Sequence, residues 1–262
     1  MYLVGADPEL FVRRQGVLQS AFGLIFGTKA EPLPVERGAV QVDGMALEFN
    51  IDPAKSCEEF SLNIKTVLAQ LKGMVPDYDF DISPVAEFGQ EYIATQPEAA
   101  RELGCDPDFC AYTGAENPRP DGERGFRTAS GHIHVGFCEG VDKSDPSHLQ
   151  DCMMVVRQLD YYLGVPSLLL DTDVRRRELY GKAGAFRPKS YGVEYRVLSN
   201  FWLRSEQAIE WVYKQTMLAL RDLEAGKIAP DVQHIIDNNM VDEAKRIVSE
   251  EDWGLPCLSC AQ

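Results

Sequence analysis

Long apolar runs are missing from this sequence, and so is an excess of positive charge. No stretch approaches the roughly 20 apolar residues of a membrane-spanning helix. The opening MYLVGADPELFVRR lacks the basic start and apolar run of a secretory signal. The 26 Lys and Arg are outnumbered by 41 Asp and Glu, giving a formal net charge of −15. We therefore expect a soluble, cytoplasmic protein that binds neither membranes nor nucleic acid.

Two familiar nucleotide-binding motifs are also missing. Neither GxxxxGK[ST] nor GxGxxG occurs, so P-loop and Rossmann folds are not indicated. The seven cysteines are an odd number and do not resemble a disulfide framework. Cys105 with Cys110 and Cys257 with Cys260 are spaced so that they allow a thiolate zinc site. Reduced free thiols are the alternative interpretation.

The composition and periodicity of the chain predict a mixed globular fold. At 262 residues, with 45% apolar and 26% charged residues, the chain suits one large domain or at most two small ones. Alternating patterns predict strands at ELFVRR, AVQVD, MALEFNI and VAEFGQEYIA (85–94). Helical spacing predicts helices over 56–73, 95–104, 147–163, 205–226 and 241–250. A Gly- and Pro-rich stretch predicts a long loop before residue 131, a lid or a disordered segment.

The stretch FRTASGHIHVGF, residues 126–137, holds two of only four histidines. Alternate side chains of a strand leave on one face, so His132 and His134 share a face while Ile133 and Val135 share the other. Such a pair on an apolar-backed strand is typical of metal or phosphate chemistry. Histidines that are hydrogen-bonded within a polar core are the alternative.

Three further segments place polar residues two apart in the same way. The pairs are Asp7 with Glu9, Glu48 with Asn50 after a preceding Asp43, and Glu194 with Arg196. A solvated sheet face would alternate similarly, and that is the simpler interpretation of any single segment. Four such segments that share acids, imidazoles and a guanidinium favour one common site.

Positive charge is concentrated in the segment 173–196, amid acidic surroundings. The cations are Arg175, Arg176, Arg177, Lys182, Arg187, Lys189 and Arg196. This concentration implies an anionic ligand, and arginine suits phosphate because its fork donates two parallel hydrogen bonds. The acids and imidazole form a mainly oxygen donor set, which suits Mg²⁺ or Mn²⁺. If both sets meet in one pocket, a polyphosphate would lie between metals and guanidinium groups, as phosphoryl transfer requires.

Four motifs in this order resemble the series of the glutamine synthetase and glutamate–cysteine ligase superfamily. They are DPE from Asp7, DGMALEFN from Asp43, GHIHVG from Gly131 and EYR from Glu194. The fuller strings TASGHIHVGF and YGKAGAFRPKSYGVEYRVLSNFW resemble more closely the phage-encoded carboxylate–amine ligases, or amidoligases, of that superfamily. The resemblance spans roughly residues 3–202.

This resemblance implies an α+β fold with one amidoligase catalytic domain over residues 1–262, of which 203–262 form a helical C-terminal portion. A curved antiparallel sheet with flanking helices would form a glutamine-synthetase-like funnel that holds ATP and two or three Mg²⁺ ions. The substrates would be a small-molecule or peptide carboxylate and an amine. The acid would take the γ-phosphate to become an acyl phosphate, which the amine then attacks. A phage-encoded protein would act in the host cytoplasm, and an oligomer is compatible with the resemblance.

The resemblance also implies roles for individual residues. Asp7, His132 and Glu194 would bind the metal between the ATP phosphates. Glu9 and Glu48 would bind the metal near the acid, and Asp43 is a further candidate for this second set. Arg196 would stabilise the transferring phosphoryl group, and the expected catalytic residues are Arg187, Glu194 and Arg196. The expected nucleotide contacts are His134, Arg177, Lys182, Arg187 and Arg196.

The sequence departs from the family pattern in three ways. Asp7 stands where a glutamate is usual, the spacing from Asp43 to Glu48 is tighter, and no residue matches an amine-recognition role. The scaffold is also that of guanidino kinases, which is a second enzymatic interpretation. A metal-dependent hydrolase and a non-catalytic binding protein are the remaining alternatives.

Overall fold

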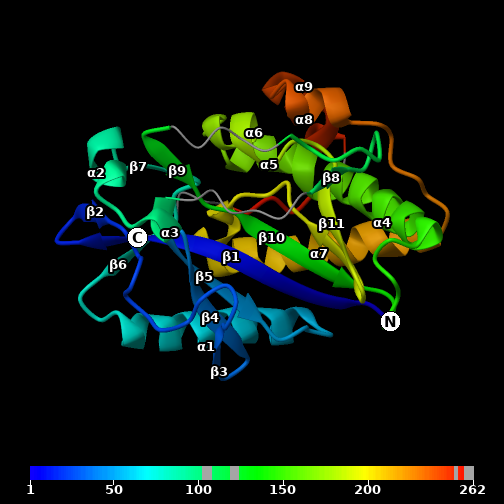
Figure 1. The fold of residues 1–262 in the computed structure, drawn as a ribbon. Helices are drawn as coiled ribbons and strands as arrows, with labels where there is room; N and C mark the ends of the chain where they lie inside the picture. Colours follow the sequence, from blue (N-terminus) through cyan, green and yellow to red (C-terminus); the bar gives the residue numbers. More distant parts are fainter. Residues whose placement is uncertain (102–107, 119–123, 251–252, 257–262) are drawn as a thin grey trace.

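The computed structural model describes residues 1–101, 108–118, 124–250 and 253–256. Within these residues the chain is a mixed α/β structure with a large antiparallel sheet (Figure 1). The strands are β1 (Leu3–Arg14), β2 (Val17–Gln19), β3 (Leu33–Val35), β4 (Gly38–Asp43), β5 (Ala46–Ile51), β6 (Asp79–Asp81), β7 (Val85–Glu87), β8 (Phe109–Cys110), β9 (Phe126–Thr128), β10 (Gly131–Gly136), β11 (Ala185–Lys189) and β12 (Gly192–Tyr195).

The large sheet has the strand order β3-β4-β5-β1-β10-β12-β11-β8, and β2 and β6 pair with the far end of β1. β7 and β9 form a separate two-stranded sheet. The long strand β1 is central because it pairs with β10 along its first half and with β5 further on. Segments that are distant in sequence therefore lie side by side at the middle of the sheet.

One face of the sheet is covered by helices. The helical elements are α1 (Cys57–Met74), α2 (Gln90–Ala94), α3 (Glu98–Arg101), α4 (Pro146–Leu159), the π-helical turn η1 (Asp160–Gly164), α5 (Val165–Leu170), α6 (Arg175–Leu179), the 3-10 turn η2 (Asn200–Arg204), α7 (Glu206–Glu224), α8 (Gln233–Asp237) and α9 (Val241–Ser249). α1 contacts β4 and β5, α4 contacts β11 and β12, and α7 packs against both helices (Figure 1).

The main hydrophobic core lies between the sheet and this helical layer. Ile133 and Val193 from the sheet are fully buried there, as are Phe60 of α1 and Val156 of α4. The alternating apolar positions of the strands supply this face, as the period-two pattern predicted. The polar positions of the same strands are left to point to the opposite, open face.

Local sequence signals fix the ends of the longest helices. Ser56 accepts a hydrogen bond from the Glu59 amide at the start of α1, and Ser205 accepts one from the Ala208 amide at the start of α7. Side-chain caps of this kind satisfy backbone donors that a helix start leaves unpaired. The predicted helices over 56–73, 205–226 and 241–250 are confirmed within one or two residues, and 147–163 is confirmed as α4 continued by η1.

Two predictions between residues 85 and 131 are wrong. The predicted strand over 85–94 ends at Glu87, because Gly89 adopts a positive φ of 81° and α2 follows it. The predicted loop contains two short strands: β8 begins at Phe109, and β9 begins at Phe126. The predicted helix over 95–104 is observed over Glu98–Arg101, and its last residues lie outside the described chain.

No helix in the described ranges combines the length and apolar character needed to cross a bilayer. The main core draws on residues from Val4 to Trp253, so both ends of the described chain contribute to one cluster. The assignment of residues 1–262 to a single domain remains a prediction.

Candidate functional site

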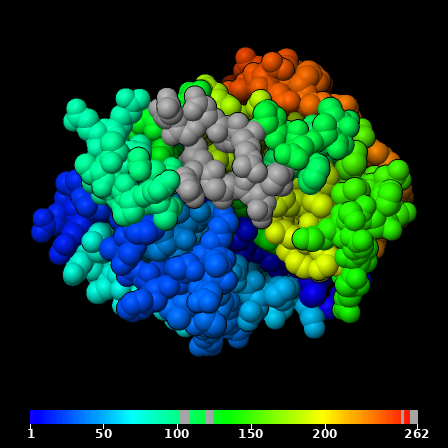
Figure 2. Space-filling view, in the orientation of Figure 1, coloured from blue at the N-terminus to red at the C-terminus, as the bar shows by residue number. Residues whose placement is uncertain are grey.

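The open face of the sheet carries a cavity of about 250 Å³ where β5, β1, β10 and β12 lie side by side. In the space-filling view a hollow opens between the blue N-terminal residues and the yellow residues near 190 (Figure 2). All four predicted polar pairs contribute to its lining, with Asp7, Glu9, Glu48, His132, Glu194 and Arg196. The register explains this convergence, because Asp7 lies opposite His132 and Glu9 lies opposite Glu48.

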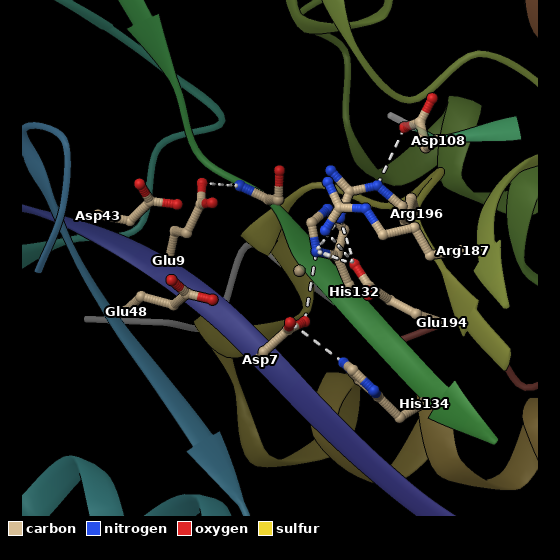
Figure 3. A network of polar contacts seen from close by, with 12 residues as sticks. Asp7, Glu9, Asp43, Glu48, Asp108, His132, His134, Arg187, Glu194 and Arg196 are labelled. Carbon is tan, nitrogen blue, oxygen red and sulfur yellow. Dashed lines mark hydrogen bonds and ion pairs between the residues drawn. The ribbon is translucent and has the colours of Figure 1, made fainter. Parts of the chain in front are cut away.

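Two carboxylates of this lining meet the imidazole of His134, which lies just outside it (Figure 3). One possible ligand atom from each of Asp7, His134 and Glu194 lies within 4.8 Å of the others. His134 Nε2 is 3.1 Å from Asp7 Oδ2, and the Glu194 side chain is only 1% exposed. Asp7 Oδ1 is buried and faces the ring of His132. Oxygen atoms with one imidazole are a fitting donor set for Mg²⁺ or Mn²⁺.

His132 lies between the same two carboxylates but has a different protonation preference. Its Nδ1 is 3.3 Å from Asp7 Oδ1 and 3.5 Å from Glu194 Oε1. Burial, assisted by the charge of Arg196, lowers the pKa of His132 to about 4. Burial also opposes the charge on His134, but Asp7 outweighs it and raises the pKa of that ring. His132 is therefore neutral at pH 7 and able to ligate a metal through nitrogen.

Cations surround Glu194 on its other side (Figure 3). Arg196 donates to its carboxylate, Lys189 Nζ is 2.7 Å from Oε2, and Arg187 is 3.5 Å from Oε1. Burial alone would raise the pKa of Glu194, but the charge of Arg196 holds it well below its usual range. We call Asp7 and Glu194, with the histidines and cations beside them, the paired group.

Arg196 is held from two sides. Its Nη1 donates to Glu194, and its Nε donates to Asp108 Oδ2 at 3.0 Å. The side chain is 5% exposed, so its orientation is fixed within the protein rather than by solvent. A guanidinium that is already positioned and desolvated is able to stabilise negative charge with little reorganisation.

A second set of acids, Glu9, Asp43 and Glu48, lines the same cavity, and we call it the acidic group. Glu9 Oε2 accepts a hydrogen bond from the Ser130 amide at 2.7 Å, and Glu48 Oε2 accepts one from Gln41 at 2.6 Å. These neutral donors orient the two carboxylates without neutralising them. Like charges directly opposite each other on neighbouring strands are destabilising.

The acids of this group perturb one another. Burial, followed by the charge of Asp43, raises the pKa of Glu9 to about 7. Burial, followed by the charge of Asp7, raises the pKa of Glu48 well above its ordinary value. Asp43 lies 3.1 Å from Lys29 at the cavity edge. A bound divalent cation would relieve the repulsion that these raised pKa values reflect.

A larger cavity of about 680 Å³ adjoins the first one. Asp7, Gln41 and Glu48 border both cavities. The second cavity is lined mainly by apolar and aromatic side chains, together with His134; they include Leu3, Ile51, Pro53, Phe137 and Tyr191. A wide apolar cavity with a few polar groups at one edge suits a flat organic ligand.

Two predicted phosphate ligands lie away from these cavities. Arg177 is buried and donates to the Asp171 carbonyl at 3.0 Å and to Asn239 at 3.3 Å. Lys182 is exposed and lines neither cavity. The structure thus does not bring either residue to the site. The residues around Arg177 form the short helix α6, so its neighbour Arg176 points to the sheet instead and donates to Ser130 Oγ at 3.1 Å.

Sequence reasoning also missed several residues of the site. Lys189 follows Arg187 by two positions on β11, and Gln41 precedes Asp43 by two on β4, so the same-face rule that selected the pairs would have found both. Asp108 had no such signal, because it precedes a strand of only two residues.

The proposed zinc ligands are mostly outside the described residues, since Cys105, Cys257 and Cys260 are not described. Cys110 is buried and carries a free thiol. The zinc site therefore stays a prediction.

Residues 124–234 match the family model described as phage phiEco32-like COOH.NH2 ligase-type 2. This segment is less than half of the chain and includes β10, β11 and β12, with His132, His134, Arg187, Glu194 and Arg196. The acids of β1 and β5 precede it. No curated protein matches the chain. The predicted relationship to phage-type carboxylate–amine ligases is thus confirmed by similarity to that family over residues 124–234.

Proposed function

We propose that this protein is an ATP- and Mg²⁺-dependent ligase that joins a carboxylate to an amine through an acyl phosphate. The observation that carries the proposal is the meeting of the acidic group and the paired group in one cavity (Figure 3). The match to carboxylate–amine ligases supports the type of reaction. Hard-metal donors beside buried guanidinium groups suit the transfer of a phosphoryl group from a nucleotide.

Two metal positions have suitable donors. Asp7 and Glu194 with either histidine of the pair would hold one ion, and Glu9 with Glu48 would hold a second. Bound Mg²⁺ would neutralise charge on the phosphate oxygens and orient the acid against the γ-phosphate. The Ser130 amide and Gln41 keep the second pair of carboxylates oriented toward the cavity.

The remaining chemistry belongs to the cations of the paired group. Arg196 would stabilise the charge that spreads over the transferring phosphoryl group, because Asp108 and Glu194 fix its orientation. Arg187 and Lys189 would contact phosphate oxygens from the neighbouring strand β11. Glu194 keeps its own charge at neutral pH because Arg196 lowers its pKa.

The larger cavity would take the nucleoside. Its aromatic and apolar lining suits a purine base, and its border at Asp7 would bring the phosphates to the first metal position. The acid and the amine would then enter through the smaller cavity. This arrangement, with a nucleotide on one side of the metals and substrates on the other, corresponds to the glutamine-synthetase-like funnel, which we propose for the curved sheet.

Isothermal titration calorimetry with Mg²⁺ and a non-hydrolysable ATP analogue tests the binding step. We expect the wild-type chain to bind the analogue only with Mg²⁺, and Glu194→Gln to lose at least about tenfold in affinity because the metal loses an anionic ligand. Glu91→Gln is a matched control, since Glu91 is exposed on α2 away from both cavities. Equal affinity in all three chains would contradict the proposal.

Turnover distinguishes the ligase from its alternatives. A ligase releases ADP and phosphate when both an acid and an amine are supplied. Release of ADP without free phosphate would indicate a guanidino kinase instead. Hydrolysis with Zn²⁺ and no nucleotide would indicate a metal-dependent hydrolase, and nucleotide binding without turnover a binding protein.

A further inference from the structure

Buried arginines in this chain differ in what neutralises them. Among the described residues the buried arginines are Arg127, Arg176, Arg177 and Arg196. Arg196 forms ion pairs with Asp108 and Glu194. The charge of Asp171 acts on both Arg176 and Arg177. Three of these four guanidinium groups therefore have acidic neighbours.

Arg127 is the exception. Its side chain lies on β9 and the residue is 6% exposed. Nη1 donates to the carbonyls of Arg124 and Phe126 at 3.0 Å, and Nη2 donates to the Arg101 carbonyl at 3.2 Å. Nε is buried and has no acceptor within the described part of the chain. The titratable side chain that acts on it is Tyr180 rather than a carboxylate.

That no acid among the described residues pairs with Arg127 is unexpected, because the sequence has 41 acidic residues and 26 Lys and Arg. Carbonyl oxygens accept hydrogen bonds from a guanidinium but do not neutralise its charge. A buried cation without an anion has a desolvation penalty that no attraction offsets. Burial accordingly lowers the pKa of Arg127. An anion supplied from outside the chain would remove this cost.

Arg127 lines the same cavity as the acidic and paired groups. Thr128 and Tyr180 accompany it there, and its strand β9 belongs to the small sheet rather than to the large one. The residue does not line the larger cavity, where the nucleoside is proposed to bind. Its hydrogen bonds within the described residues go to the carbonyls of Arg101, Arg124 and Phe126 and to no member of the paired group, where the phosphates are proposed to lie. We therefore assign an anion at Arg127 to a substrate rather than to the nucleotide.

Building on the proposed ligase function, we propose that Arg127 binds a second anionic group of the acid substrate, a carboxylate or a phosphate. The carboxylate that reacts would lie at the acidic group, near Arg196. Arg127 is then a specificity-determining residue, and the enzyme selects acids with two anionic groups over monocarboxylic acids. Arginine is suited to this role because its planar donors match the oxygens of either anion.

Calorimetry on the full chain tests this inference, with Mg²⁺ and the non-hydrolysable ATP analogue already bound. The probes are butyrate, glutarate and 3-phosphonopropionate, which share a carboxylate and differ in the second group. We expect the wild-type chain to bind one of the two dianionic probes at least about tenfold more tightly than butyrate, since only the dianionic probes can accept charged hydrogen bonds from Arg127. The preferred probe identifies the second group as carboxylate or phosphate.

Three variants test whether Arg127 causes the preference for a dianionic probe. Arg127→Gln should bind the preferred dianionic probe no more tightly than butyrate, and Arg127→Lys should retain part of the preference because it keeps the charge. Arg124→Gln is the matched control, since Arg124 is a nearby arginine whose side chain is 45% exposed and pairs with Glu178 at 3.7 Å. It should bind all three probes as the wild-type chain does.

Two results would overturn the inference: a wild-type chain without any preference for a dianionic probe, or a preference that survives in folded Arg127→Gln. If that variant is unfolded by circular dichroism, Arg127→Lys decides, and unchanged relative affinities in it would equally overturn the inference. Failure of the proposed function gives a different result, because the wild-type chain would then not bind the nucleotide analogue at all.

Discussion

The two carboxylate sets of the cavity occupy neighbouring strands but have opposite electrostatic environments. In the paired group, Asp7 and Glu194 lie among histidines, Lys189 and Arg196, and their pKa values are lowered. In the acidic group, Glu9 and Glu48 have only neutral hydrogen-bond donors, and their pKa values are raised. The paired group is neutralised by the chain itself, whereas Glu9 and Glu48 form no ion pair within the described residues.

This difference in electrostatic environment follows from which parts of the sequence supply the strands. The acids of the acidic group lie on β1, β4 and β5, which the first 51 residues supply, while the cations lie on β11 and the segment after β12. The sheet order places β10, followed by β12, on one side of β1 and β5 on the other. Beyond β1, Lys29 at the cavity edge pairs with Asp43, but Glu9 and Glu48 form no ion pair within the described residues. A divalent metal is therefore the natural partner for these two acids.

Removing the cation that defines the paired group should have the largest effect on activity. Arg196→Gln is expected to lower ligase turnover by roughly 100- to 1000-fold, the usual loss when one positioned donor to a developing charge is removed. The measurement is ADP release in the presence of an acid and an amine. Arg196→Lys keeps the charge but loses the paired donors of the guanidinium. Its turnover should lie between those of Arg196→Gln and the wild-type chain. Unchanged turnover in Arg196→Gln would remove this residue from the mechanism.

The same substitution on the two sides of the cavity should change stability with opposite signs. Glu194→Gln is expected to lower the free energy of unfolding by about 3 kcal/mol, because it leaves Arg196 and Lys189 buried without their anion. Glu9→Gln is expected to raise it by roughly 1 kcal/mol at pH 8, because it removes a repelled carboxylate. Urea denaturation in the absence of divalent metal compares the two, and changes of the same sign would contradict the comparison.

Mg²⁺ should stabilise the chain more as the pH rises. The raised pKa of Glu9, about 7, means that the folded chain holds this proton more tightly than the unfolded chain. Its contribution to stability is present below the ordinary glutamate pKa and is lost as the pH rises through 7. The lowered pKa of His132 opposes this loss only weakly, because the folded ring is neutral and the unfolded ring, half protonated at pH 6.5, loses its proton by about pH 8.

We therefore expect the metal-free chain to lose on the order of 1 kcal/mol between pH 6.5 and 8. Saturating Mg²⁺ should restore this loss, so the rise in melting temperature that Mg²⁺ causes is larger at pH 8 than at pH 6.5. Differential scanning calorimetry measures both values. The rise should be much smaller in Glu9→Gln, and a rise that does not depend on pH would contradict the assignment of a metal to the acidic group.

The smallest effect on nucleotide affinity is expected when Lys182 is substituted. Sequence reasoning had placed this residue among the nucleotide ligands. Because the side chain is exposed and outside both cavities, Lys182→Gln should bind the Mg²⁺-nucleotide analogue with wild-type affinity. Calorimetry under the same conditions gives the comparison. A tenfold loss would show that the cations around α6 take part in binding after all.

Period-two patterns predicted the most important part of the site. Asp7, His132 and Glu194 could be placed on common faces because their strands have buried apolar residues at the intervening positions, such as Ile133 and Val193. The pairing of the strands was not predictable from these patterns, since it depends on long-range contacts. The resemblance to the ligase family led us to expect that the polar faces of these strands meet in one site.

The predictions that failed depended on weaker local signals. Arg176 and Arg177 are adjacent, and only the turn of α6 decides that Arg176 points to Ser130 while Arg177 points to Asp171. The segment VAEFGQEYIA alternates like a strand, but Gly89 changes the chain direction after three paired residues. Arg127 could not be singled out either, because its lack of an acidic partner is a property of the folded chain.

The most direct test is a crystal structure of the chain with Mn²⁺ and a non-hydrolysable ATP analogue, with the metals located by their anomalous scattering. The proposal predicts one ion bound by Asp7 and Glu194 with a histidine of the pair, and a second ion at Glu9 and Glu48. It also predicts the triphosphate between these ions and Arg196. Metal and nucleotide bound elsewhere, with Glu9 and Glu48 free of any cation, would contradict it.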